Sequence, residues 1–162
     1  MFIRTLIAAA TVATAMGANS ASANEHLKRI LNCSDNQGRR VMTLINPSIG
    51  PAAMLVRTHR GYPVIVLNGK MLRRVGLPTL VFAFYRKCAH LMLRHPVRRN
   101  VRHEAQADCW AIQHMAKRRL LNVKTANQII KPVYRYTGNA RGKYVLSCAR
   151  QVARHIPRGT RS

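Results

Sequence analysis

The chain has 162 residues, and its 28 Lys and Arg against only four Asp and Glu give a formal net charge of +24. This length allows one small domain with a single core, and a hydrophobic content of 48% excludes a disordered basic tail. Such an unbalanced charge favours polyanionic partners such as nucleic acid, lipopolysaccharide or anionic lipid, without indicating a fold or an activity.

The N-terminal segment, residues 1–23, has the pattern of a signal peptide. One basic residue, Arg4, precedes an alanine-rich apolar run, and Ala21-Ser22-Ala23 matches a small-residue cleavage site. The run is short for a membrane span, and polar sequence follows it directly. We therefore expect an exported protein, periplasmic or secreted, whose mature chain is a single domain over residues 24–162 with no transmembrane segment.

Short strands are predicted in the first part of the mature chain. Two apolar runs, residues 53–58 and 63–67, are separated by a His-Arg-Gly-Tyr turn and predict a β-hairpin. Residues 41–45 predict a third short strand, which ends at Asn46-Pro47. Together these segments predict a small antiparallel sheet.

Helical patterns follow residue 69. Residues 78–94 predict one apolar-rich helix, because Pro78 suits the first position of a helix. Asn100 is suited to cap a second helix that runs to residue 119.

Two further helices are predicted near the C-terminus. The first covers residues 125–136, with a kink at Pro132 and a stop at Gly138, and the second covers residues 143–155. The predicted fold class is α+β, a small antiparallel sheet followed by a bundle of about four helices.

Four cysteines, an even number, indicate disulfides in an oxidising compartment, with three connectivities to choose from. We favour Cys88–Cys109 together with Cys33–Cys148. The first pair joins two neighbouring predicted helices, and the second ties the two ends of the mature chain together. Because the chain has no C-x-x-C pair, a thiolate metal site is disfavoured.

Half of the acidic residues lie four positions apart, at Glu104 and Asp108. Residues at this spacing share one face of a helix, as Arg86 and His90 do on the preceding predicted helix. If the two helices pack antiparallel, the two faces meet. Histidine and carboxylate from two helices are typical ligands of zinc.

Residues 82–112 resemble the gluzincin-type zinc metallopeptidases, particularly small exported bacterial proteins with the pattern F-x-x-A-H-E-C-A-H-H…E-x-x-A-D-C. In that family an H-E-x-x-H helix supplies two histidine ligands and a glutamate that activates the metal-bound water. The resemblance implies a minimal metallopeptidase-like core in which His90 and Glu104 are metal ligands and Asp108 supports them. Cys88 and Cys109 also match the pattern.

The chain departs from that pattern at two positions. Arg86 replaces the first histidine and Lys87 replaces the catalytic glutamate. Arginine has no lone pair to donate, and a lysine 4 Å from a divalent cation is repelled by ~8 kcal/mol at an effective dielectric of 20. We therefore expect no catalysis and no cofactor, and an Arg86–Glu104 ion pair, with Asp108 and Lys87 in the same cluster, where the metal would lie.

A basic patch lies between the two halves of the motif, at Arg94, Arg98, Arg99 and Arg102. Such runs are usually solvated faces, but few acids exist here to balance them. The alternative function is therefore a cationic envelope protein that binds anionic polymers or membrane surfaces. Aromatic content is only 6% and no nucleic-acid motif is present, which disfavours sequence-specific recognition.

A second alternative is an atypical, active zinc peptidase with a substitute ligand. His95 or His103 would then complete a site with His90 and Glu104. His95 is five residues from His90, off its helical face, which disfavours this arrangement.

Overall fold

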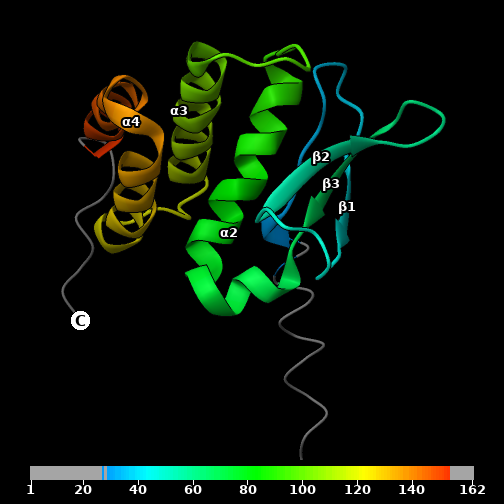
Figure 1. The fold of residues 1–162 in the computed structure, drawn as a ribbon, viewed down its shortest axis with the longest axis horizontal. Coiled ribbons are helices and arrows are strands. Elements are labelled where there is room, and N and C mark those ends of the chain that lie inside the picture. The colour runs from blue at the N-terminus through cyan, green and yellow to red at the C-terminus, as the bar shows by residue number, and fades with distance from the viewer. Residues whose placement is uncertain (1–26, 28, 154–162) are drawn as a thin grey trace, which may run out of the picture. The chain divides into compact units, whose positions relative to one another are not determined.

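The computed structural model of the protein describes residue 27 and residues 29–153. The predicted signal peptide, residues 1–23, and the last residues of the final predicted helix, 154–155, lie outside the described residues. The chain divides into two compact units, Met1–Ile30 and Leu31–Ser162. Every element labelled in Figure 1 belongs to the second unit.

The sheet has three strands, β1 (Met42–Ile45), β2 (Ala53–Arg57) and β3 (Pro63–Leu67), in the order β1-β3-β2. β2 and β3 form the predicted antiparallel hairpin, and the α+β class is confirmed. The prediction of a wholly antiparallel sheet is wrong, because β1 pairs with β3 in parallel. All five residues of β3 are apolar and buried, so this strand takes the central position that an apolar run favours.

The helix α2 spans Gly69–Met92 and is interrupted near its start. The buried Asn68 caps it, because its side chain accepts a hydrogen bond from the backbone N–H of Lys70 at 3.0 Å. Gly76 has φ +76°, a conformation that favours glycine. It separates a short first helical segment from the longer helix that begins close to Pro78. The helix predicted from Pro78 is therefore the second part of α2.

The helix α3, Val101–Lys117, begins as predicted after Asn100, whose side chain accepts from the backbone N–H of His103 at 2.9 Å. The helix α4 runs without interruption over Val123–Ala153. The predicted stop at Gly138 is therefore wrong. One internal glycine costs a helix only about 1 kcal/mol, and the packing of α4 on α3 offsets this cost.

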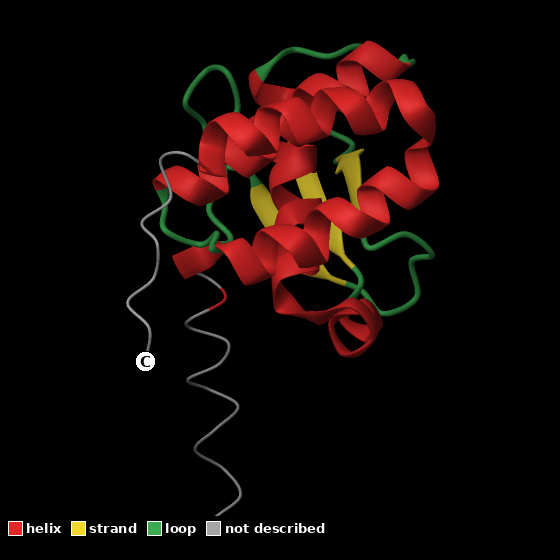
Figure 2. Ribbon diagram, turned by 90° about the vertical axis from the view of Figure 1, so that its left-hand side faces the viewer, coloured by secondary structure: helices red, strands yellow, loops and turns green. Residues whose placement is uncertain are grey.

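The helices form successive layers beside the sheet. Figure 1 shows α2 next to the strands, then α3, then α4, and Figure 2 shows the helices in front of one face of the sheet. The core lies where α2 meets β3 and α3, and its largest fully buried side chains include Ile65, Phe84, Tyr85, Ile112 and Met115. Among the described residues, no helix has the length and apolarity that a membrane span needs.

Two disulfides are present, Cys33–Cys88 and Cys109–Cys148, so the predicted pairing is wrong. The cause is helical geometry: Cys88 is two positions, about 200°, from both Arg86 and His90, which face α3. Cys88 therefore points away from α3, toward the segment that carries Cys33. Cys109, about 100° from Asp108 on α3, meets Cys148 on α4 instead.

We predict that the Cys109→Ala/Cys148→Ala double variant loses roughly 2–4 kcal/mol of unfolding free energy, since this disulfide closes a sequence separation of 39 residues. Chemical denaturation of oxidised wild type and variant measures the loss. Peptide mapping of the unreduced wild type should recover Cys33–Cys88 and Cys109–Cys148. A Cys88–Cys109 peptide in that map would contradict the structure.

Candidate functional site

The polar residues singled out by the motif meet at the contact between α2 and α3. α2 contributes Arg86 and His90, and α3 contributes Glu104 and Asp108. Asp108 is fully buried and His90 is 2% exposed, whereas Arg86 and Glu104 keep partial exposure. The i,i+4 spacing on each helix is what directs both pairs toward the same contact.

The Arg86 guanidinium connects both acids of α3. Its Nη2 group donates to Glu104 Oε2, and its Nε lies 2.9 Å from Asp108 Oδ1. One planar cation thus joins a half-buried and a fully buried carboxylate across two helices. The Nη2 contact with Glu104 is a charge-assisted hydrogen bond, one of the stronger polar interactions in proteins, whereas the Nε contact with Asp108 is an ion pair.

His90 extends the cluster on the other side of Glu104. Its Nε2 lies 3.5 Å from Glu104 Oε1, and its Nδ1 lies 2.9 Å from Nδ1 of His95. Nε2 of His95 in turn lies 3.2 Å from Gln106 Oε1. A neutral His90 that directs Nε2–H to the carboxylate has its lone pair at Nδ1, the atom that faces His95.

The electrostatics of the cluster favour an ionised Glu104 and a neutral His90. The contact with His90, together with the Arg86 charge and against the effect of burial, holds the pKa of Glu104 well below its ordinary range. Burial lowers the pKa of His90, with help from the charges of Arg99 and Lys87 and against the contact with Glu104. Burial likewise lowers the pKa of His95.

These residues do not fit a zinc site. Zinc needs three or four donor groups. Of the three protein ligands in the metallopeptidase pattern, this chain has only His90 and Glu104. Arg86 carries positive charge against both acids and cannot ligate a metal. Among residues 27 and 29–153 no group of three or more His, Cys, Asp or Glu is arranged to hold a metal ion. His95 contacts His90 and Gln106, and His103 takes part in the cap of α3.

The four arginines of the predicted basic patch differ in their exposure to solvent. Arg94 follows α2 in a left-handed conformation with φ +53°, and Arg98, Arg94 and Arg102 are exposed. Arg99 is half-buried, and its side chain lines a cavity that also contains His90. The four arginines of the patch thus have two different environments.

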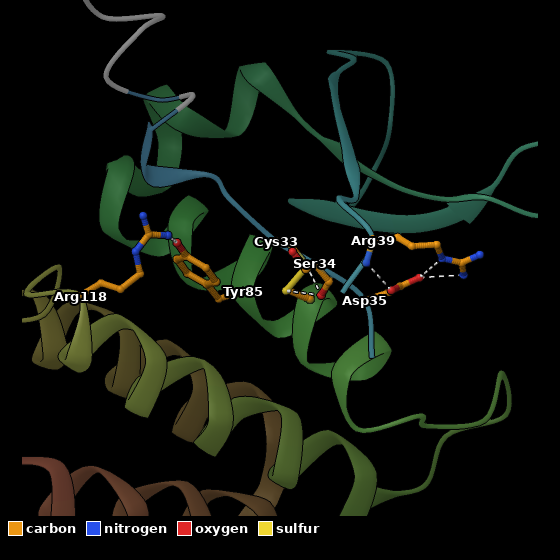
Figure 3. Close-up of a disulfide and its surroundings, with 7 residues drawn as sticks. Cys33, Ser34, Asp35, Arg39, Tyr85 and Arg118 are labelled. Atoms are coloured by element: carbon orange, nitrogen blue, oxygen red, sulfur yellow. Dashed lines mark hydrogen bonds and ion pairs between the residues drawn. A yellow bond between two sulfur atoms is a disulfide. The ribbon is translucent and has the colours of Figure 1, made fainter. Parts of the chain in front are cut away.

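Two polar contacts near the Cys33–Cys88 disulfide have no signal in the sequence. Arg118 donates to the hydroxyl of the buried Tyr85, and Figure 3 shows these two side chains directed toward each other. Asp35, also buried, pairs with Arg39 at 2.7 Å (Figure 3). Burial alone would raise the pKa of Asp35, but its hydrogen bonds with Arg39 and the backbone of Gln37 lower it.

Comparisons of the chain with models of protein families, with curated proteins and with solved structures find no match. The resemblance to metallopeptidases therefore rests on the motif residues alone.

We predict that Arg86→Met lowers the free energy of unfolding by about 2–4 kcal/mol at pH 7, because it leaves buried carboxylate charge without its cation. Arg102→Met, an exposed change in the first turn of α3, should change it by less than about 0.5 kcal/mol. Urea denaturation of both variants and of the wild type measures the difference.

The same loss should depend on pH. The folded state holds the pKa of Glu104 below its ordinary value of 4.5. The ionised carboxylate therefore contributes its full stabilisation above pH 4.5, and this stabilisation declines as the pH falls below 4.5. The gap between the wild type and Arg86→Met should therefore narrow below about pH 4.5. A gap that is absent at pH 7, or that widens in acid, would contradict the ion pair.

Proposed function

We propose that the protein is an exported, non-catalytic relative of zinc metallopeptidases in which an ion-pair cluster replaces the metal. The observation that carries this proposal is the contact of Arg86 with both Glu104 and Asp108, in the position where the family pattern has a ligand histidine. A guanidinium here places positive charge against the two acids and leaves no set of donors for a metal. Without the metal and the catalytic glutamate, replaced by Lys87, no water is activated.

Export is supported by the signal-like segment before residue 24 and by the two disulfides, which are compatible with an oxidising compartment. In such a compartment the disulfides hold the segment before β1 to α2, and α3 to α4. The α2–α3 contact between them carries no disulfide, and the Arg86 cluster is a polar connection there.

The metal content of the mature, oxidised protein tests this proposal. We predict less than about 0.1 zinc per chain after dialysis against a weak chelator, and no peptidase activity. The Arg86→His/Lys87→Glu variant restores the pattern H-E-x-x-H with Glu104 nearby and should bind about one zinc. Stoichiometric zinc in the wild type would favour the atypical zinc peptidase, and a well-folded double variant without zinc would remove the proposed ancestry.

A second candidate function, binding of anionic polymers, is favoured by the exposed arginines between α2 and α3. Arg94, Arg98 and Arg102 are all exposed, and no acid lies between residues 94 and 103. Their attraction to a polyanion would arise from release of counterions and would fall steeply with salt.

We predict salt-sensitive retention of the mature protein on heparin. The Arg94→Gln/Arg98→Gln/Arg102→Gln variant should elute at lower salt, and its retention should fall less steeply as salt is raised. Lys117→Gln/Lys124→Gln/Lys143→Gln removes three exposed charges elsewhere on the helices and serves as the control. If both variants lose the same amount of heparin retention, retention depends only on the net charge of the protein.

A further inference from the structure

A cavity of about 500 Å³ lies between the edge strand β2 and the loop that joins α2 to α3. β2 contributes Leu55, Val56 and Arg57, and the loop contributes Arg94 and Arg99. The cavity also reaches His90, so it opens directly beside the cluster described above. Its size suits one small group of the dimensions of a sugar phosphate.

Positive charge dominates the lining. Four arginines face the cavity, Arg39, Arg57, Arg94 and Arg99, with Asp35 as the acid. Asp35 is already satisfied, because it accepts from Arg39 Nε at 2.8 Å and from the backbone N–H of Gln37 at 2.9 Å. Asp35 and Arg39 therefore neutralise each other, and the charges of the other three arginines remain.

Arg99 gives an independent indication of a ligand. Its Nε is buried, yet it has no hydrogen-bond partner among the described residues. Buried donors are almost always paired, and an unsatisfied guanidinium N–H is costly. An anion in the cavity would accept this hydrogen bond.

Arg94 and Arg57 are held at the same cavity by neighbours. With its carboxamide oxygen turned toward the guanidinium, Asn36 accepts from Arg94 Nε at 2.6 Å and from Nη2 at 2.9 Å. Arg57 donates through Nη1 to the carbonyl oxygen of Gly61 at 2.8 Å. Both side chains are thus positioned by uncharged acceptors, and their positive charge is not cancelled.

The lining also limits the class of anion. Arginine forks match the oxygens of a phosphate, and the described residues that line the cavity include no Phe, Tyr or Trp on which a nucleobase could stack. Apolar side chains, among them Leu55, Val56 and the 91% exposed Val97, lie beside the arginines. We propose that this cavity binds a phosphate group carried by a sugar or lipid head group. The proposal specifies the site and ligand class of the polyanion binding proposed above.

Calorimetric titration of the mature, oxidised protein with inorganic pyrophosphate at physiological salt tests the site. Arg94→Gln and Arg99→Gln should each weaken binding by about tenfold or more, since each removes a charge-assisted contact. Arg98→Gln and Arg102→Gln remove the same charge from neighbouring positions outside the cavity and should weaken it by less than about twofold. Arg99→Lys keeps the charge but loses the fork, and should also weaken binding more than Arg102→Gln does.

Two further ligands identify the carrier of the phosphate. Vesicles of phosphatidylcholine with phosphatidic acid should bind with the same dependence on Arg94 and Arg99 if the carrier is a lipid head group. Binding of pyrophosphate without vesicle binding would assign a soluble phosphate ester to the same site. An oligothymidylate that binds more tightly than either, through the same two arginines, would overturn the ligand class.

Equal weakening by all four glutamine variants, or no pyrophosphate binding by the folded wild type, would overturn the site. Circular dichroism of each variant establishes that it is folded. Salt-sensitive heparin retention can persist when this inference fails, so the two failures are distinguishable.

Discussion

The contact between α2 and α3 depends on one guanidinium. Arg86 reaches Glu104 and the fully buried Asp108 from the neighbouring helix, and His90 lies on the far side of Glu104. Buried carboxylates need compensating partners, and the cation of α2 stabilises the two acids of α3 at this place. In a metallopeptidase a divalent ion could meet the same requirement. Here the permanent side-chain charge of Arg86 lies against both acids.

The disulfides lie on either side of this contact. Cys33–Cys88 fastens α2 to the segment before β1, and Cys109–Cys148 fastens α3 to α4. The faces of α2 and α3 that meet are therefore joined by polar contacts and core packing, while their outer faces are joined covalently. Beyond His90, the cavity lined by Arg94 and Arg99 continues the polar surface toward the edge of the sheet.

Much of this arrangement follows from local sequence. The hairpin of β2 and β3, the cap at Asn100 and the shared helical faces are short-range features with clear residue signals. The parallel pairing of β1 and the course of α4 through Gly138 depend on tertiary packing, which propensities do not contain. The partner of Cys88 could have been predicted better from the sequence, because Cys88 cannot share the helical face of Arg86 that was expected to meet the next helix. By contrast, Arg57 of β2 and Arg99 of a distant loop line the same cavity, and no local feature of the sequence indicates this.

Arg86 and Glu104 together form a polar connection between α2 and α3. A double-mutant cycle with Arg86→Met and Glu104→Gln measures their coupling directly, from the unfolding free energies of the four proteins at pH 7. We predict a coupling energy of about 1.5–3 kcal/mol in favour of the pair. Additive effects, with a coupling below about 0.3 kcal/mol, would contradict it.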